Sequence, residues 1–292
     1  VINRGERHLF LAPWHGRTLV GVWHGVYEGH PEDYHVTDAE LEGFVAEVNE
    51  AYPEAELSTH EITRWEAGLI PFGEASGKDG ELKFGHRSRF VDHGRREGLE
   101  GLWTLIGARY TTAPTEAPRA VGQIMRRLGK RAGASTLETT RWRGGEFEDL
   151  GTIVTSARRR VAGEVDEDSL WALAHNHGAA IDEVLGLVDQ DKTLAERIPN
   201  SCTIKGEVVH AVREEMALSL VDVALRRTDL ATAGHPGRAA IEATSRLMAQ
   251  ELQWDEPTRR SEANELDRAL RARQPGVASK PHVGPEKVES RG

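Results

Sequence analysis

The amino-acid sequence predicts an α+β fold in which an antiparallel sheet precedes an all-helical C-terminal part. Two apolar runs, residues 9–14 and 18–23, have the composition of strands and are joined at a His-Gly dipeptide. A capping box at Thr37 and Glu40, followed by apolar residues at helical spacing, predicts a helix behind the two strands. From Asp166 onward, the pattern of apolar residues is that of successive helices.

The remaining N-terminal segments carry weaker signals. Pro13 is typical of an edge strand or of an early strand end. Residues 61–72 and 84–92 are predicted to be extended, with a polar, glycine-rich loop between them. A helix is predicted around residues 120–128, where Pro118 is tolerated only in the first turn.

The domain organisation follows from the change of pattern along the chain. Residues 1–129 carry the strand signals, and residues 130–161, with weaker periodicity and clustered basic groups, are interpreted as a connection. Residues 162–273 are interpreted as a helical domain, and residues 274–292, with almost no large apolar side chains, as a disordered tail. Helices of this domain are predicted at residues 170–175, 179–188, 207–225, 238–252 and 258–271.

Composition argues against several classes of protein. The net charge of -10 argues against nucleic-acid binding, which favours a basic surface. The single cysteine, Cys202, excludes an internal disulfide framework and fits a reducing compartment. No apolar run approaches the roughly 18 residues of a transmembrane helix. Because strand-like sequence begins within a few residues of Val1, we expect the chain to be truncated at its N-terminus.

The most informative stretch is residues 102–112, where an apolar strand-like run ends at Gly107 and a helix follows. This turn delivers Arg109, Thr111 and Thr112 to the start of the helix, where backbone N–H groups and the helix dipole favour an anion. No glycine-rich phosphate loop accompanies the turn. The pattern therefore indicates one half of a site for an anionic cofactor or substrate. A plain strand–helix turn capped by threonine is the structural alternative.

Four sequence blocks occur in a recognisable order. They are Phe-Leu-Ala-Pro-Trp-His-Gly-Arg-Thr-Leu-Val-Gly at 10–21, Tyr-Glu-Gly-His-Pro at 27–31 followed by Val-Thr at 36–37, Ile-Gly-Ala-Arg-Tyr-Thr-Thr at 106–112, and Val-Val-His-Ala-Val-Arg-Glu-Glu-Met-Ala at 208–217 with Asp222 and Arg-Arg-Thr at 226–228. Together they resemble the C-terminal part of FAD-dependent glycerol-3-phosphate dehydrogenases, within the D-amino-acid-oxidase-like flavoprotein superfamily. The resemblance implies a substrate-side sheet, a strand and helix that return to an FAD domain, and a dinucleotide-binding segment upstream of Val1.

The resemblance also implies roles at the turn. Gly107, Ala108, Thr111 and Thr112 would contact FAD, and Arg109 stands where the family has a lysine. Because arginine stays protonated, Arg109 would bind an anion or stabilise reduced flavin and would not act as a general base. A surface salt bridge is its structural alternative.

Substrate recognition is implied at two further places. Arg87 or Arg89 would hold a substrate phosphate, with an exposed basic strand as the alternative. Ile70 stands where the family has a second phosphate-binding arginine, a change that removes on the order of 1.5–3 kcal/mol of anion recognition. His24 also departs from the family pattern. It is a candidate catalytic acid or base, or else a structural histidine.

The implied activity is transfer of a hydride from a hydroxyl-bearing carbon to FAD, with electrons passing on to a quinone-type acceptor. A cytoplasmic location is expected, either free or peripheral to the inner face of the membrane. Ile70 and His24 keep open a flavoenzyme for another hydroxy or amino acid. Because the phosphate loop is missing, a second interpretation stays open: the chain is a non-catalytic fragment or module that does not bind FAD by itself.

No metal site is predicted, despite 13 histidines. His175 and His177 lie two residues apart and face different sides of a helix, and no carboxylate or cysteine completes a ligand set. Several charged residues of the C-terminal helices fit an ion-pair network better than an active site. They are Glu214, Glu215, Asp222, Arg226 and Arg227.

Overall fold

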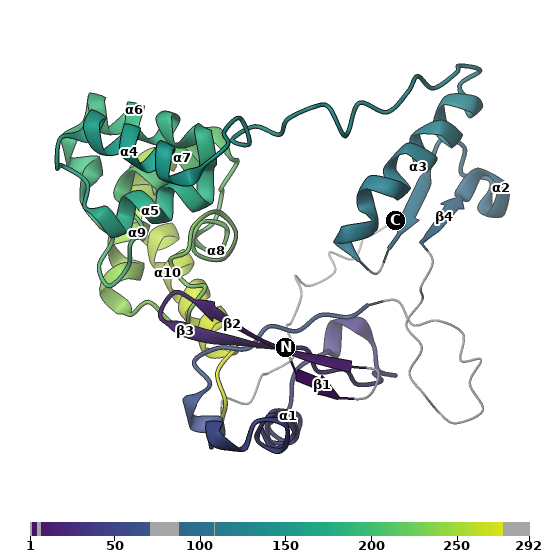
Figure 1. The fold of residues 1–292 in the computed structure, drawn as a ribbon, viewed down its shortest axis with the longest axis horizontal. Coiled ribbons are helices and arrows are strands. Elements are labelled where there is room, and N and C mark those ends of the chain that lie inside the picture. The colour runs from purple at the N-terminus through teal and green to yellow at the C-terminus, as the bar shows by residue number, and fades with distance from the viewer. Residues whose placement is uncertain (1, 5–6, 71–87, 108, 277–292) are drawn as a thin grey trace. The chain divides into compact units, whose positions relative to one another are not determined.

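A computed structural model describes residues 2–4, 7–70, 88–107 and 109–276. These residues form two compact units, whose elements are labelled in Figure 1. The described residues of the first unit fall within 1–24, 32–67 and 142–276, and those of the second within 25–31 and 68–141. The predicted glycine-rich loop and most of the predicted C-terminal tail lie outside the described residues.

The first unit begins with a three-stranded antiparallel sheet in the order β1-β2-β3. Its strands are β1 (Ile2–Arg4), β2 (Arg7–Trp14) and β3 (Arg17–Gly21). The two strands predicted at residues 9–14 and 18–23 are confirmed, although the second ends at Gly21.

A two-residue turn at His15 and Gly16 joins β2 to β3. Both residues have positive φ, 46° and 72°, which is the backbone conformation of hairpin turns that match the twist of the strands. Pro13 pairs with Thr18, beyond Leu9, where the β1 register ends. Proline therefore lies in the part of β2 that is paired on one side, as its missing N–H favours.

Helix α1 (Asp38–Ala51) forms where the capping box predicts it. Thr37 Oγ1 accepts a hydrogen bond from the Glu40 N–H at 3.2 Å, and Glu40 Oε2 accepts one from the Thr37 N–H at 2.8 Å. The helix buries Leu41 and Val48, which lie on one face because they are two turns apart. The reciprocal cap and the apolar face confirm the predicted helix.

Residues 62–70 contain no strand, in contrast to the extended segment predicted there. Their polar groups bond to loops of the C-terminal part instead. Thr63 Oγ1 donates to the Ala233 carbonyl at 2.9 Å, and the Trp65 N–H donates to the Arg273 carbonyl at 3.0 Å. These hydrogen bonds give polar groups of the segment partners in the absence of a neighbouring strand.

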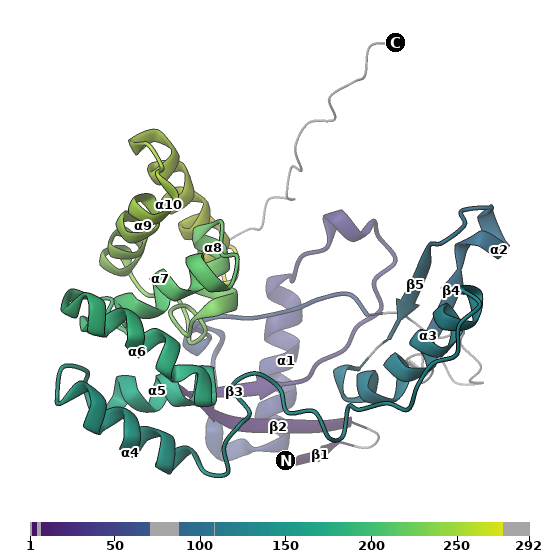
Figure 2. The same ribbon diagram turned by 90° about the horizontal axis from the view of Figure 1, so that it is seen from above.

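The C-terminal part of the first unit is helical, as predicted. Its helices are α4 (Leu150–Val161), α5 (Glu167–His177), α6 (Ile181–Gln190), α7 (Lys205–Glu214), α8 (Leu220–Asp222), α9 (Arg238–Leu252) and α10 (Glu256–Arg271), with a π-helical turn, η7, at Val223–Arg227. Figure 2 shows α7 between α4, α5 and α6 on one side and α9 and α10 on the other. One apolar core is built on α4 to α6, and a second on α7 to α10.

Helix α4 corrects the interpretation of residues 130–161 as a connection. It buries Val154, Ala157 and Val161 in the first of the two cores. The Asp149 side chain caps it by accepting a backbone N–H at 2.8 Å. Three consecutive arginines in its last turn dilute the apolar periodicity of this stretch, which is why the sequence pattern is weak there.

The single helix predicted at residues 207–225 is interrupted. Helix α7 ends at Glu214, and Ser219 caps α8 by accepting the Asp222 N–H at 3.2 Å. Asp222 Oδ2 accepts in return from the N–H groups of Leu218 and Ser219 at 3.1 and 3.0 Å. These local polar caps end one helix and begin another, although the apolar periodicity continues.

We expect Asp222→Asn to lower the free energy of unfolding by about 1 kcal/mol near neutral pH, because hydrogen bonds to a charged acceptor are the stronger ones. Burial raises the pKa of Asp222, but hydrogen bonds from Ser219 and the Leu218 N–H outweigh burial and hold the pKa below its usual value. A lowered pKa contributes stability above about pH 4 and loses it as the pH falls through the folded-state value. Urea unfolding across this range measures the effect. A difference between the two proteins that does not shrink in acid would contradict it.

The second unit contains a two-stranded antiparallel sheet. Strand β4 (Arg89–Asp92) pairs with β5 (Trp103–Ile106), and the short helix α2 (His93–Glu97) lies between them in sequence. Asp92 caps α2 by accepting the Gly94 N–H at 3.0 Å. The extended segment predicted at 84–92 is confirmed for residues 89–92, and residues 84–87 lie outside the described part.

Helix α3 (Ala113–Arg127) confirms the helix predicted around residues 120–128, but it begins earlier. Pro118 consequently falls in its second turn, which corrects the position expected for it. Pro114 occupies the first turn instead. The helix accommodates Pro118 by giving up one backbone hydrogen bond to the preceding turn.

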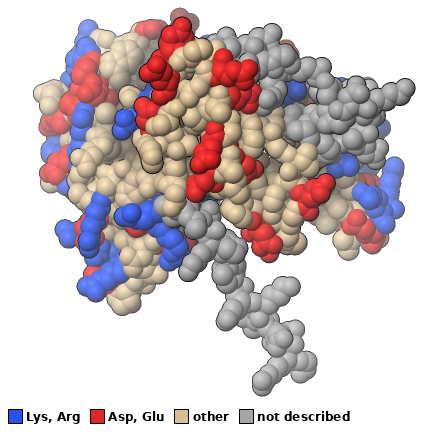
Figure 3. All heavy atoms as spheres, turned by 90° about the horizontal axis from the view of Figure 1, so that it is seen from below, with Lys and Arg blue, Asp and Glu red and all other residues tan. Residues whose placement is uncertain are grey.

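Short 3-10 turns complete the described fold. They lie at Pro31–Asp33, Pro53–Ala55, Thr59–Glu61, Tyr110–Thr112, Gly178–Ala180 and Lys192–Ala195. None of the described helices combines the length and the apolar character needed to cross a bilayer. On the face drawn in Figure 3, the described Lys and Arg side chains occur in small groups near Asp and Glu.

Candidate cofactor and substrate site

The strand–helix turn after β5 has the outline that the sequence predicts. Strand β5 ends at Ile106, the chain passes Gly107, and the 3-10 turn Tyr110–Thr112 leads directly into α3. Gly107 is exposed, and a Cβ built there would meet Ser88 Oγ at 3.6 Å as its one neighbour within 4 Å among the described atoms. A ligand can therefore approach the backbone at Gly107 closely.

Thr112 closes this turn on itself. Its Oγ1 donates to the Arg109 carbonyl at 2.8 Å, and its N–H donates to the same oxygen at 3.3 Å. The Thr112 hydroxyl thus has a structural role, as expected for a plain strand–helix turn capped by threonine. Arg109 and Thr111 are exposed, and the Arg109 guanidinium makes no ion pair within the described residues. A cation and a hydroxyl at this turn are therefore accessible to an anion.

Strand β4 brings a second arginine to the same turn. Arg89 is the register partner of Ile106, the residue directly before Gly107. Its side chain is exposed and, among the described residues, forms no ion pair. Arg89 and Arg109 therefore flank Gly107 along the paired backbone, where two cations raise the local potential for an anion.

The remaining predicted site residues lie outside the described part of the chain or belong to the other unit. Arg87 and Ala108 fall outside the described residues. His24 belongs to the first unit, where it is half-buried and follows β3. The predicted residues that the structure brings together are Arg89, Gly107, Arg109, Thr111 and Thr112.

Apolar side chains of the second unit are poorly covered. No residue of α3 is buried, and Val121 and Leu128 are 52% and 61% exposed. On β5, Leu105 is 44% exposed. A helix with an apolar stripe and no buried residue is typical of an interface that another segment covers.

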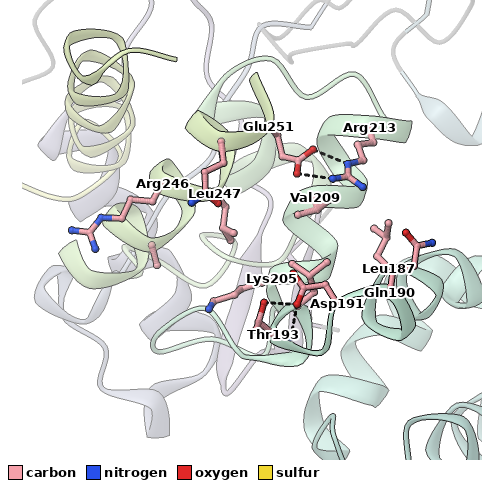
Figure 4. A pocket seen from close by; sticks show the side chains of 13 residues that line it. Leu187, Gln190, Asp191, Thr193, Lys205, Val209, Arg213, Arg246, Leu247 and Glu251 are labelled. Atoms are coloured by element: carbon pink, nitrogen blue, oxygen red, sulfur yellow. Dashed lines mark hydrogen bonds and ion pairs between the residues drawn. The ribbon is translucent and has the colours of Figure 1, made fainter. Parts of the chain in front are cut away.

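A cavity of about 510 Å³ lies in the first unit, lined by residues of α6, α7 and α9 (Figure 4). Its charged side chains are already paired. Arg213 donates to both carboxylate oxygens of Glu251 at 2.7 and 2.8 Å, and Lys205 donates to Glu196 at 2.5 Å. These pairs argue against a polar ligand site. Of the residues predicted to form an ion-pair network, Arg226 pairs with Asp222 at 2.8 Å.

Sequence reasoning missed a buried polar cluster between α5 and α7. Glu207 is fully buried: its Oε2 accepts the Ile204 N–H at 3.3 Å, and its Oε1 lies 3.3 Å from His177 Nε2. His210 is also buried, with Nε2 at 3.2 Å from Glu183 Oε2. The partners come from separate helices, so no local spacing marks them.

The described fold and turn define an α+β protein with a cationic strand–helix turn and a helical C-terminal part. Residues 104–259, more than half of the chain, match the C-terminal domain of alpha-glycerophosphate oxidase, and the chain belongs to this family. The match confirms the resemblance inferred from the sequence blocks.

Curated relatives agree with the family. The glycerol-3-phosphate dehydrogenase of Synechocystis sp. is 28% identical over 252 residues, which cover 85% of this chain and 45% of the relative. The aerobic glycerol-3-phosphate dehydrogenase of Bacillus subtilis is 23% identical over 278 residues, 90% of this chain and 48% of the relative. The chain therefore spans about half the length of the curated relatives it matches.

Proposed function

We propose that this chain supplies the substrate-side sheet and the C-terminal domain of an FAD-dependent dehydrogenase that oxidises glycerol 3-phosphate or a close analogue. The observation that carries the proposal is the extent of the family match. It begins at Thr104 in β5, so the turn with Arg109 lies inside the matched segment. Both relatives named above are glycerol-3-phosphate dehydrogenases by name. The exposed cations at the turn support an anionic ligand there.

The dinucleotide-binding part of the FAD site is proposed to come from a segment outside these 292 residues. The sequence holds no glycine-rich phosphate loop, and the exposed apolar stripe of α3 is a surface that such a segment would cover. The residues present fit the flavin end of the cofactor. Gly107 leaves the backbone open, and Arg109 and Thr111 offer polar groups beside it.

Bound FAD would supply the acceptor for the hydride of the substrate C–H bond and would relay the electrons to a quinone-type acceptor. His24 stays the predicted acid or base for the hydroxyl proton of the alcohol. Arg89 or Arg87 holds the substrate phosphate and orients the reacting carbon. Arg109 stabilises negative charge and exchanges no proton.

Flavin content tests this proposal. The protein extended by its natural upstream segment is expected to purify with about one FAD per chain. Its oxidised flavin is expected to absorb at about 450 nm. Gly107→Val is expected to abolish the flavin, because a branched side chain blocks the approach to the backbone. Gly43→Val, at an exposed position of α1 that also has open space, is the matched control and retains it. An extended protein that folds but holds no flavin would refute the proposal.

A second candidate is a flavoenzyme for another hydroxy or amino acid, favoured by Ile70 and His24. Ile70 removes a phosphate-binding charge expected from the family, and it is exposed, so no compensating contact holds it in a core. Relative turnover of glycerol 3-phosphate, 2-hydroxy acids and amino acids separates the two candidates.

A further inference from the structure

Three side chains of the first unit place metal-binding atoms close together. His177 is the last residue of α5, His210 lies in α7, and Glu215 caps the end of α7. One ligand atom of each lies within 4.8 Å of those of the other two. The two imidazole rings meet edge to face, with centroids 5.3 Å apart. Their side chains are only 6% and 3% exposed.

His210 has one nitrogen that is hydrogen-bonded and one that is not. Its Nε2 lies 3.2 Å from Glu183 Oε2, so Nε2 carries the proton. Its Nδ1 is buried, has no hydrogen-bond partner among the described residues, and lies 3.9 Å from Glu215 Oε1. The buried Nδ1 lone pair is thus left unsatisfied and faces a second electron-pair donor, the Glu215 carboxylate. A cation between them resolves this arrangement.

A carboxylate also lies behind the second imidazole. His177 Nε2 is 3.3 Å from Oε1 of Glu207, which is fully buried. Carboxylates in this position are the usual outer partners of metal-bound histidines, because they fix the ring and raise its basicity. Both imidazoles of the cluster therefore have the support that a metal ligand needs.

The charges around the cluster favour a cation. The Glu183 carboxylate lies behind His210, with Oε2 at 3.2 Å from Nε2. His177 and Glu215 lie at the C-terminal ends of α5 and α7, where the helix dipole is negative. Arg143 is committed to Glu183 by a two-pronged ion pair and does not face the cluster as a free charge.

A cavity of about 320 Å³ lies beside His210, and solvent reaches the cluster at Glu215, whose side chain is 27% exposed. It is lined by Arg143, Glu183, Leu187, His210, Arg213 and Glu214. Water can therefore complete a coordination shell. Three protein ligands and one water form a common tetrahedral zinc set.

We propose that His177, His210 and Glu215 bind a divalent transition-metal ion, with Zn²⁺ as the best match. Two imidazoles and one carboxylate suit zinc, whereas Mg²⁺ and Ca²⁺ prefer oxygen ligands. Bonds of about 2.0–2.2 Å would draw the ligand atoms to about 3.4 Å from one another. The site joins the ends of α5 and α7, so the bound ion stabilises the first unit. The sequence predicted no such site, because His177 finds its partners on another helix.

Zinc binding by the tag-free, metal-depleted protein tests the inference. Competition with a chromophoric chelator is expected to show one tightly bound Zn²⁺ per chain, and Co²⁺ in its place is expected to give the visible bands of a tetrahedral site. Glu215→Gln is expected to weaken Zn²⁺ binding at least about tenfold. Glu265→Gln, at an exposed position of α10 that does not line this cavity, is the control and leaves the affinity unchanged.

Two results would overturn the inference. The first is a wild-type protein that does not compete with the chelator for Zn²⁺ at micromolar concentration. The second is a tightly bound ion that survives the double variant His177→Gln, Glu215→Gln, because that ion would lie elsewhere on the chain. Circular dichroism of each variant shows that loss of binding is not loss of fold.

Discussion

Replacing Glu207 with alanine is expected to lower the free energy of unfolding by about 3–5 kcal/mol, a large part of the stability of a typical domain. The carboxylate is fully buried. It accepts the Ile204 N–H at the start of α7 and an Asn176 side-chain N–H at 3.4 Å, and it faces His177 Nε2. Alanine removes these acceptors and leaves the Ile204 N–H and the His177 ring buried without them, whereas Asn176 keeps its bond to Asp229. The free-energy cost of the unsatisfied donors adds to the cost of the new cavity.

Two matched variants isolate this effect. Glu207→Gln keeps one acceptor oxygen and the side-chain volume, so its loss is expected to be smaller. Glu196→Ala removes a carboxylate that is 62% exposed and pairs with Lys205, and such pairs contribute roughly 0–1 kcal/mol. Urea unfolding in metal-free buffer measures all three. Equal losses for Glu207→Ala and Glu196→Ala would show that burial of the cluster does not matter.

The sequence predicts helices best where the signals are local. The helix predicted at residues 238–252 is α9 to the residue, and the helix behind Thr37 is α1. In α1, the cap and the apolar face lie within a few turns of each other, so no knowledge of distant residues is needed. The hairpin at His15 and Gly16 is predictable for the same reason.

Prediction is wrong where a local rule competes with a distant partner. Residues 62–70 have the composition of an extended segment, but bonds to Ala233 and Arg273 take the place of a partner strand. Helix α4 is recognisable only from the apolar core in which its side chains are buried. After Glu214, the cap formed by Ser219 and Asp222 ends a periodicity that by itself would continue.

In the candidate site, too, some features are predictable from local sequence and others depend on distant partners. The turn from Gly107 to Arg109 is visible in the sequence, because strand, glycine and helix start are consecutive. The place of Arg89 depends on the register of β4 against β5, which sequence alone leaves undetermined between Arg87 and Arg89. His210 lies inside a block that marks the family, yet its partners Glu183 and Glu215 are assigned only by packing.

Arg89→Ala in the complete enzyme is expected to lower kcat/KM for a phosphorylated substrate by roughly 10- to 150-fold, which corresponds to about 1.5–3 kcal/mol for a hydrogen bond to a charged group. The unphosphorylated analogue should lose far less, because the arginine has no partner on it. The structural basis is the pairing of Arg89 with Ile106, which sets this cation beside the turn that carries Arg109.

Arg95→Ala is the matched control for this substitution, since its side chain is 87% exposed on α2 and pairs only with Asp92 among the described residues. It is expected to leave both substrates unaffected. Arg87→Ala, measured in parallel, decides between the two candidate arginines, because the one that holds the phosphate shows the selective loss. If both variants lower kcat/KM equally for the phosphorylated and the unphosphorylated substrate, neither arginine binds phosphate. The substrate is then recognised without it, as Ile70 in place of an arginine would favour.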